Sequence, residues 1–313
     1  FNVVSYILLS SATLPPALVQ GLFEAYRHGR QHHERNRGEQ PGAVNRAATV
    51  CCLWIDEFRQ TQSDCTDAPA FAAAHQAFAE RRATRLADAE MRRRVMLQPL
   101  PLSGLRHDEL SPRLAELARD AALALHQQHH SVDPRSGRRV SFGLIRMANI
   151  EPLVEVALAL YRLGAPPGVQ IHLCTSRSQF PLLIRSAIEH RFDAALDRRQ
   201  PAAVFDLPDV RRHIDAHAAA DQLFIVLGSP VTEVGRDHDY DWAVVEPSSM
   251  RSLIQLAGRV RRQRPGACTS PNIAVFDANL RNFRRPGMPA YCRPGFETAA
   301  LLLDSHQLGV LWP

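Results

Sequence analysis

The second half of the chain predicts an α/β protein whose mainly parallel sheet is covered by helices on both faces. Short runs of Val, Ile, Leu and Phe alternate there with segments of helical spacing. Apolar runs of this kind are typical of strands that are buried on both faces of a sheet. With 313 residues, of which 45% are hydrophobic, the chain is long enough for one large domain or two modest ones.

The elements of this sheet follow from the runs in order. The expected strands are residues 140–146, 169–174, 223–227, 242–246 and 273–276. The expected helices between them lie near residues 150–163, 179–190, 209–219 and 249–258. Because ligands of parallel sheets bind at the carboxyl ends of the strands, we expect the functional residues in the loops directly after these runs.

The first half of the chain predicts a more irregular order of elements. A buried strand, a tight turn and a helix ending at Arg27 are followed by a polar stretch without regular structure. The expected ranges are strand 3–9, polar stretch 28–42, strand 49–55, helix 68–94, strand 96–100 and helix 107–130. The chain opens on Phe1, inside the first expected strand, so we expect a piece of a longer polypeptide.

Composition restricts the chemistry of this chain. All 37 basic residues are arginine, so the chain itself supplies no lysine of a Walker A loop and no Schiff base. The net charge of +5 and the pI near 9.1 favour polyanionic partners, although coding bias explains the arginine total equally well. Six cysteines without a CxxC pair argue against a zinc ribbon and a disulfide framework. We therefore expect a cytoplasmic protein without a membrane span.

The most specific pattern lies in the helix expected after the strand 242–246. A spacing of i, i+3, i+4 and i+7 would place four residues on one face of a continuous helix: Gln255, Gly258, Arg259 and Arg262. Two guanidinium groups beside a residue without a side chain suit close approach to a triphosphate, where they stabilise charge on the transferred phosphoryl group. A basic, solvated helix is the alternative.

Hydroxyl and acidic groups follow the expected strand 223–227. Ser229, Thr232 and nearby backbone amides can hold phosphates, and Gly235 permits an unusual turn. Asp237 can accept a hydrogen bond from a ribose hydroxyl or brace an arginine. A metal site in the acidic run 237–241 is the weaker interpretation, because acids near a basic segment are more simply its ion-pair partners on a loop surface.

Two further hydroxyl-rich turns follow expected strands. Ser176 and Arg177 stand just before an expected helix, where hydroxyl groups and backbone amides bind phosphate. An ordinary helix cap with a surface arginine is the alternative. The second turn follows the first expected strand and consists of Ser11, Ala12 and Thr13. Its alternative is an ordinary turn and helix cap without a binding role.

Together these four patterns resemble motifs III, IVa, V and VI of superfamily 2 helicases, in the same order. The resemblance is carried by SSATLPP at 10–16, the turn 174–178, the stretch 233–241 and QLAGRVRR at 255–262. The stretches VTEVGRDHDYDW and FGLIRMANIEPLVEVALAL look most like the CRISPR-associated helicase-nuclease of type I systems, in particular the I-F form fused to an adaptation subunit. The resemblance covers residues 1–27 and 138–280.

The resemblance implies a motor of two RecA-like domains that hydrolyses ATP with Mg²⁺ in the cleft between them and moves 3′ to 5′ along single-stranded DNA. A histidine-aspartate nuclease domain with its own metal, outside this chain, would degrade that strand after a guide-RNA surveillance complex recruits the enzyme. The other implied partners are domains of the same polypeptide, adaptation proteins and inhibitors. The phosphate-loop lysine and the acidic pair for magnesium belong to the first domain, ahead of Phe1.

The resemblance also implies roles for single residues. Arg259 and Arg262 match the arginine fingers, and Gln255 matches the motif glutamine. Three residues match positions beside the nucleotide: Asp237, Gly235 and Gly258. Four match contacts to the nucleic-acid backbone: Ser176, Arg177, Ser229 and Thr232. Three match the motif that couples nucleotide state to DNA grip: Ser11, Ala12 and Thr13. The chain departs from the family in reading Thr175 where a histidine is usual, and Ser229 where a threonine is usual.

We therefore expect four regions along the chain. They are the end of a first RecA-like domain at 1–58, an arginine-rich helical linker at 59–92, a second RecA-like domain at 93–280 and a C-terminal extension at 281–313. The acidic run around Asp56 imitates a helicase motif but stands on the wrong side of motif III, so we reject it. Alternatives are another superfamily 2 helicase of RNA or DNA, a non-catalytic module that binds nucleic acid or a protein partner, and a metal-dependent hydrolase at 237–241.

Overall fold

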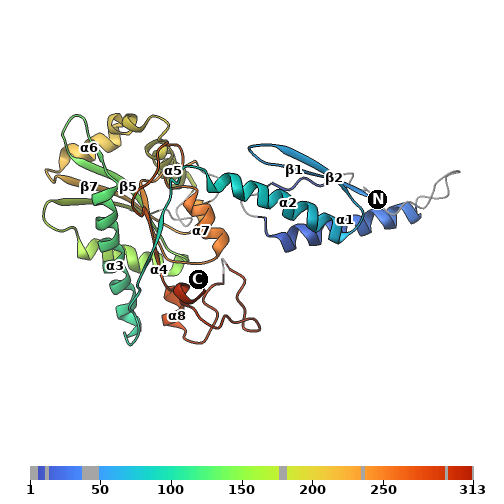
Figure 1. The fold of residues 1–313 in the computed structure, drawn as a ribbon. Helices are drawn as coiled ribbons and strands as arrows, with labels where there is room; N and C mark the ends of the chain where they lie inside the picture. The colour runs from blue at the N-terminus through green and yellow to red at the C-terminus, as the bar shows by residue number, and fades with distance from the viewer. Residues whose placement is uncertain are drawn as a thin grey trace. The chain divides into compact units, whose positions relative to one another are not determined.

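The computed structural model describes residues 6–10, 14–36, 49–175, 182–233, 237–292 and 295–311, with only the backbone at 182–185. The chain divides into two compact units, residues 1–90 and 91–313 (Figure 1). Each unit has its own hydrophobic core.

The first unit packs two helices against an antiparallel hairpin. Its elements are α1 (Pro16–Asn36), β1 (Val50–Ile55), β2 (Gln60–Cys65) and α2 (Ala68–Ala87). Phe23 of α1 stacks on Phe71 of α2 with ring centroids 4.4 Å apart. Trp54 of β1 is buried beside them and donates a hydrogen bond from Nε1 to Nδ1 of His75 at 3.0 Å. The unit is therefore held together by a small aromatic core.

The hairpin explains the acidic run that imitates a helicase motif. Asp56 Oδ1 accepts hydrogen bonds from the N–H groups of Phe58 and Arg59, both at 2.8 Å, and so closes the turn between the two strands. The neighbouring Glu57 pairs with Arg82 of α2 at 3.2 Å. Both acids thus stabilise the local fold of the first unit.

The sequence-based elements of the first unit are partly wrong. The strand 49–55 is confirmed as β1, but residues 6–10 are not in a strand. Residues 28–36 continue α1 instead of forming an irregular stretch, since they contain no proline and pair Arg30 with Glu34 one turn apart. The strand β2 has no apolar alternation, and its pairing with β1 supplies the order that its sequence does not predict.

The second unit contains the parallel sheet that the apolar runs predict. Its seven strands are β3 (Val95–Gln98), β4 (Ser131–Val132), β5 (Arg139–Arg146), β6 (Val169–Thr175), β7 (Asp221–Gly228), β8 (Trp242–Val245) and β9 (Ile273–Phe276). The strand order is β3-β9-β8-β5-β7-β6, and all these neighbours are parallel, while β4 pairs with β5 in antiparallel fashion. The central strand β5 lies between β7 and β8.

Helices cover both faces of this sheet, as the sequence predicts (Figure 1). The α-helices are α3 (His107–Gln128), α4 (Ile150–Leu163), α5 (Leu182–Leu196), α6 (Pro208–Ala216), α7 (Met250–Ala257), α8 (Leu280–Arg284) and α9 (Leu308–Leu311). Two 3₁₀ turns are η1 (Pro201–Asp206) and η2 (Pro230–Glu233). One core contains residues of α3, α4 and α8, and the other contains residues of α5, η1, α6 and α7.

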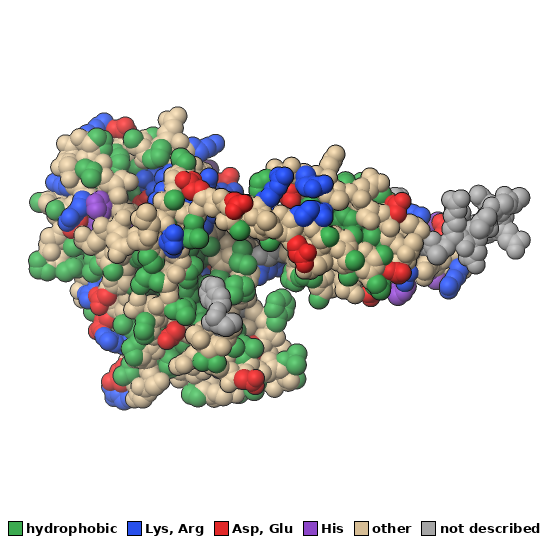
Figure 2. All heavy atoms as spheres, in the orientation of Figure 1, with side chains coloured by type: hydrophobic (Ala, Val, Ile, Leu, Met, Phe, Trp, Pro, Cys, Tyr) green, Lys and Arg blue, Asp and Glu red, His purple; other side chains and the backbone are tan. Residues whose placement is uncertain are grey.

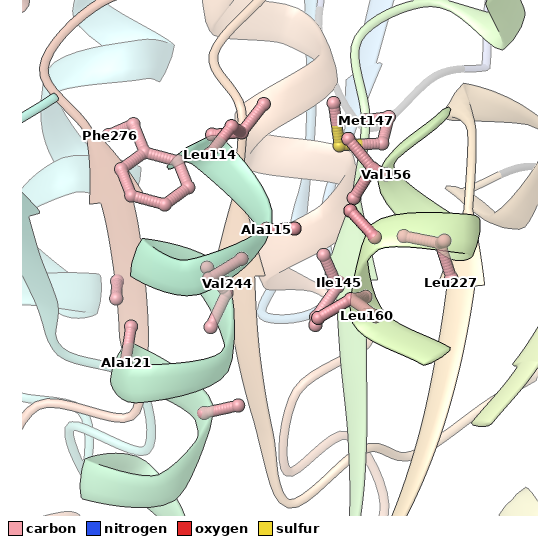
Figure 3. Packing of buried hydrophobic residues seen from close by; sticks show 14 of the residues in the cluster. Leu114, Ala115, Ala121, Ile145, Met147, Val156, Leu160, Leu227, Val244 and Phe276 are labelled. Atoms are coloured by element: carbon pink, nitrogen blue, oxygen red, sulfur yellow. The ribbon is translucent and has the colours of Figure 1, made fainter. Parts of the chain in front are cut away.

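Alternate residues of the strands point into the two cores. Val244 of β8 packs with α3 and α4, whereas its neighbours Ala243 and Val245 pack on the opposite face. Figure 3 shows Leu114 of α3 and Val156 of α4 over the sheet. Such two-sided burial fixes the strand register, because a shift by one residue would exchange the two faces.

A glycine in β5 makes room for the largest buried side chain. A Cβ atom added at Gly143 would lie 2.2 Å from the indole ring of Trp242. Trp242 is fully buried and donates a hydrogen bond from Nε1 to the Ser141 hydroxyl at 3.0 Å, so its ring is fixed at both ends. The parallel pairing of Gly143 with Trp242 therefore depends on the missing side chain.

We predict that Gly143→Ala destabilises the second unit by about 1–3 kcal/mol, because the added methyl group overpacks the indole. The matched control is Gly309→Ala, since a Cβ at Gly309 meets nothing within 4 Å. Chemical denaturation followed by tryptophan fluorescence measures both variants. Equal midpoints for the two variants would show that the indole can move aside.

The segment after α8, residues 285–311, is organised by one buried carboxylate. Oε2 of Glu297 accepts the backbone N–H groups of Ala290 and Tyr291, both at 2.8 Å. Oε1 accepts the N–H of Leu303 at 3.1 Å and lies 2.6 Å from Nε2 of His306. Burial alone would raise the pKa of Glu297, but these hydrogen bonds lower it below the ordinary 4.5. The ionised form therefore holds this segment together.

The lowered pKa of Glu297 predicts a pH dependence for this segment. The stabilisation is present above the ordinary pKa of 4.5 and is lost as the pH falls through the lower pKa of the folded state. Hydrogen exchange of residues 285–311, corrected for the intrinsic rate, should therefore lose protection as the pH falls through that lower pKa. Glu297→Gln should lower protection at pH 7 and remove this dependence, whereas the exposed-pair control Glu116→Gln should retain it. Protection independent of pH in the unsubstituted chain contradicts this role.

Candidate phosphate-binding site

Three strand ends meet at one edge of the sheet and position the candidate site. Arg146, the last residue of β5, pairs with Gly228 of β7 on one side and with Val245 of β8 on the other. The turns that follow these strands therefore lie side by side, as expected for the carboxyl ends of parallel strands. They contain η2 after β7 and the N-terminus of α7 after β8.

The helix α7 is shorter than the sequence predicts. The Ser249 hydroxyl caps its first turn by accepting the N–H of Ser252 at 3.2 Å. The helix ends at Ala257, and beyond the Gly258 cap the chain runs beside Tyr240, whose N–H donates to the Arg259 carbonyl at 2.8 Å. The prediction that one helix face presents all four motif residues is therefore wrong. Of the four, only Gln255 lies within α7, because pairing of the following residues with Tyr240 replaces further helix.

Arg259 and Arg262 nevertheless converge on one carboxylate. Oδ1 of Asp237 lies 2.8 Å from Nη2 of Arg262 and 3.7 Å from Nη1 of Arg259. The Asp237 side chain is 78% exposed, whereas that of Arg259 is 13% exposed. Burial, followed by the nearby charge of Arg262, lowers the pKa of Arg259. Two like charges thus stand beside one accessible anion, and Asp237 braces the arginines as the sequence allowed.

Arg259 is held from behind by a backbone carbonyl. The oxygen of Glu233 accepts hydrogen bonds from Nη2 of Arg259 at 2.9 Å and from Nε at 3.3 Å. The remaining nitrogen, Nη1, is shielded from solvent and has no hydrogen-bond partner within the described ranges. A guanidinium whose Nε and Nη2 are fixed, while Nη1 makes no hydrogen bond within the described ranges, is prepared to receive an anion such as phosphate.

The Glu233 side chain enters a buried charged network. Its Oε1 lies 2.8 Å from Nε of Arg146, and its Oε2 accepts a hydrogen bond from the Ser252 hydroxyl of α7. Nη2 of Arg146 also donates to Ser252 at 3.1 Å, and Nη1 donates to the Glu246 carbonyl at 2.6 Å. Burial raises the pKa of Glu233, although Arg146 and Ser252 oppose that shift.

A second carboxylate extends this network toward α8. Oε2 of Glu246 accepts the N–H of Ala148 at 2.7 Å, and Oε1 accepts the N–H of Leu280 at 2.8 Å. Burial raises the pKa of Glu246, and these two hydrogen bonds act in the opposite direction. The carboxylate therefore ties the ends of β5 and β8 to the start of α8.

The acidic run 237–241 divides between surface and interior. Asp239 and Asp241 are buried and both pair with Arg264, whose Nη2 lies 2.7 Å from Oδ1 of Asp239. Burial alone would lower the pKa of Arg264, but the two carboxylates raise it above its ordinary value. The prediction that the acids of this run form ion pairs with arginines is confirmed. The prediction that they lie on a loop surface is correct for Asp237 but wrong for Asp239 and Asp241. Across the described ranges, no group of three or more His, Cys, Asp or Glu residues is placed to hold a metal ion.

The other predicted site residues differ in their surroundings. Gln255 is half-buried on α7, and Gly258 caps that helix. Ser229 is buried, and its carbonyl accepts both the N–H and the hydroxyl of Thr232, at 2.9 and 2.8 Å. Thr232 thus stabilises the η2 turn. Outside the described residues lie Gly235, Ser176, Arg177, Ser11, Ala12 and Thr13.

Sequence reasoning missed the charged residues that lie beneath the site. Arg146 and Glu246 stand at the ends of apolar runs, where the carboxyl-end rule already expects functional groups. This position is a usable signal for both. Ser252 and Arg264 carry no comparable signal, because their partners are distant in the sequence and only the folded sheet brings them together.

Many surface arginines away from this site are paired with nearby acids. Figure 2 shows basic and acidic side chains interspersed over the face in view. Examples of local pairs are Arg113–Glu116 at 2.7 Å and Arg212–Asp209 at 2.9 Å. The total charge of +5 therefore says less about partners than the pair of arginines at Asp237 does. No helix among the described residues is long and apolar enough to cross a membrane.

The fold and the site together define an α/β domain with a mostly parallel seven-stranded sheet and a charged site at the carboxyl edge of that sheet. Residues 139–265 match the family model described as CRISPR-associated nuclease/helicase Cas3, C-terminal. Residues 139–265 therefore match the C-terminal domain of Cas3 proteins, and the chain as a whole is similar to the C-terminal part of those proteins.

Two curated relatives match nearly the whole chain. Both are CRISPR-associated nuclease/helicase Cas3 proteins of subtype I-F/YPEST. The one from Pseudomonas aeruginosa is 48% identical over 306 residues, and the one from Pectobacterium atrosepticum is 42% identical over 308. Each match covers 97% of this chain but only 28% of the relative. A crystal structure of Cas3 from T. fusca is more distant, with 17% identity, coverage of 86% of this chain and 26% of that chain, and a TM-score of 0.49.

We predict that the loss of a buried ion pair near the site lowers the free energy of unfolding more than the loss of an exposed one. Arg264→Met should cost about 3–5 kcal/mol, because it leaves Asp239 buried without its countercharge and removes one of the two arginines that lie beside the buried Asp241. Arg262→Ala should cost less than about 1 kcal/mol, because its pair with Asp237 is solvent-exposed. Urea denaturation of both variants measures the difference. Similar losses in the two variants would contradict the contrast between buried and exposed pairs.

Proposed function

We propose that this chain supplies one half of a nucleoside-triphosphate site in an ATP-dependent translocase of single-stranded DNA. The observation that carries the proposal is the convergence of Arg259 and Arg262 on Asp237, with Nη1 of Arg259 left without a hydrogen-bond partner in the part of the chain that the structure describes. Similarity to the C-terminal part of Cas3 proteins supports the same assignment.

In this proposal Asp237 holds the two guanidinium groups in place until a triphosphate approaches. A phosphate offers more charge and more acceptor oxygens than one carboxylate, so it competes well for planar guanidinium forks. Arg259 and Arg262 would then stabilise charge that develops on the γ-phosphoryl group. We assign Gln255 and Gly258, at the end of α7, to the same nucleotide site, together with Gly235.

The other half of the site belongs to a first RecA-like domain. Its phosphate-loop lysine and acidic residues would hold ATP and Mg²⁺, because this chain contains no lysine. We assign residues 1–58 to the end of that domain, 59–92 to a linker and 93–280 to the second RecA-like domain. The segment 281–313 is assigned to a C-terminal extension.

Similarity to Cas3 proteins supports a proposal for the nucleic-acid and partner roles. We propose that Ser229 and Thr232 shape a turn near the DNA backbone, with Ser176 and Arg177 contacting that backbone and Ser11, Ala12 and Thr13 coupling it to nucleotide state. A nuclease domain with its own metal, outside this chain, would degrade the displaced strand. A guide-RNA surveillance complex would recruit the enzyme in CRISPR interference.

We predict that Arg259→Ala or Arg262→Ala lowers DNA-stimulated ATP turnover by roughly three orders of magnitude, by analogy with arginine fingers of other nucleotide hydrolases. The assay uses the complete polypeptide that carries this sequence, and Arg113→Ala in an exposed ion pair is the control. Unchanged turnover in either finger variant removes that residue from the role.

Two further outcomes test the division of the site. The 313-residue chain by itself should not hydrolyse ATP, because half of the cleft lies elsewhere, and measurable turnover contradicts this. Salt-dependent DNA binding by the complete polypeptide, with no response to nucleotide, would favour a non-catalytic binding module instead.

A further inference from the structure

Glu233, the last residue of η2, makes contacts with both its side chain and its backbone carbonyl. Its side chain points into the buried network with Arg146 and Ser252, and its backbone carbonyl points to Arg259. The anchored side chain and the oxygen that contacts Arg259 belong to the same residue. Fixing the side chain therefore restricts the backbone that carries this oxygen.

The side chain of Glu233 has little freedom to move. It is 2% exposed, and Arg146 is fully buried, so neither charge can turn to solvent. Arg146 is anchored in addition by the Glu246 carbonyl at 2.6 Å. The Ser252 hydroxyl bonds the same carboxylate from α7. The end of β5, the turn η2 and the helix α7 are thus connected through one carboxyl group.

The backbone on the other side of the carbonyl is also fixed. The Ser229 carbonyl accepts both donors of Thr232, which closes the turn just before Glu233. The Glu233 oxygen then accepts two donors of Arg259 and leaves its Nη1 as the unused donor. A rigid turn can keep a guanidinium in one orientation, which long arginine side chains in water do not maintain.

We propose that Glu233 is a positioning residue, held by Arg146 and Ser252, which aims the Arg259 guanidinium through its own main-chain carbonyl. The inference rests on the proposed role of Arg259 at a triphosphate. Its consequence is that loss of the carboxylate should impair the action of Arg259 although the Arg259 side chain is still present.

A double-mutant cycle in the complete polypeptide tests this inference. The variants are Glu233→Gln, Arg259→Ala and the two combined, with Glu155→Gln as the control because Glu155 forms an ion pair with Arg284 away from the site. We expect Glu233→Gln to lower kcat for ATP by roughly tenfold with KM little changed, since it removes an interaction needed at the transition state. The double variant should be no slower than Arg259→Ala alone.

A second readout follows Arg259 without any catalysis. The Nε–H of Arg259 should exchange slowly with solvent in the 313-residue chain, as seen by ¹⁵N NMR of the arginine side chains, because the Glu233 carbonyl holds it. Exchange should become roughly tenfold faster in Glu233→Gln. Should that variant fail to fold, Ser252→Ala removes one hydrogen bond to the same carboxylate and should give the same two changes in smaller degree.

The outcomes separate this inference from the proposed function. If Arg259→Ala lowers turnover but a folded Glu233 variant leaves both kcat and Nε–H exchange unchanged, the positioning role is wrong and the proposed function stands. Additive losses in the double variant also overturn positioning. If Arg259→Ala leaves turnover unchanged while Glu233→Gln speeds Nε–H exchange, the proposed function fails and the structural link remains.

Discussion

The parallel pairing of β5 with β7 on one side and β8 on the other is the constraint on which the site depends. It brings the ends of three strands to one edge, although Arg146 is 82 positions from Gly228 and 99 positions from Val245 in the sequence. The turn η2, the N-terminus of α7 and the residues after β5 become neighbours only through this pairing. The hydrophobic cores on both faces hold the register, and the register places the charges.

Charges are buried beneath this edge at a considerable cost in desolvation. An apolar replacement of similar volume often gives a more stable fold than a buried ion pair does, so stability alone does not explain Arg146 and Glu233. An ion pair is directional, whereas apolar packing is not, because the hydrogen bonds to a carboxylate require particular distances and angles. A functional group aimed by such a pair has a defined orientation. The cost is therefore consistent with a requirement for geometry at the surface above.

The sheet could be predicted from the sequence because its strands are apolar runs whose neighbours are helices of clear periodicity. The range 150–163 agrees with α4 at both ends, and 273–276 agrees with β9. The convergence of Arg259, Arg262 and Asp237 was foreseen through their motifs, but the path of the chain was not. The spacing of the four motif residues predicts a helix through residue 262, but α7 ends at Ala257, because backbone pairing with Tyr240 competes with further helix. Buried partners such as Arg264 depend on long-range contacts that local spacing does not contain.

The close contact between Gly143 and Trp242 limits which residues homologous sequences can have at these two positions. The indole of Trp242 occupies the space that any other residue at position 143 would need, so the two positions share one fixed volume. A larger residue in β5 becomes acceptable only with a smaller one in β8. Among homologues, the two sites should therefore covary in size, and a lineage that loses the tryptophan should be freed from the glycine as well.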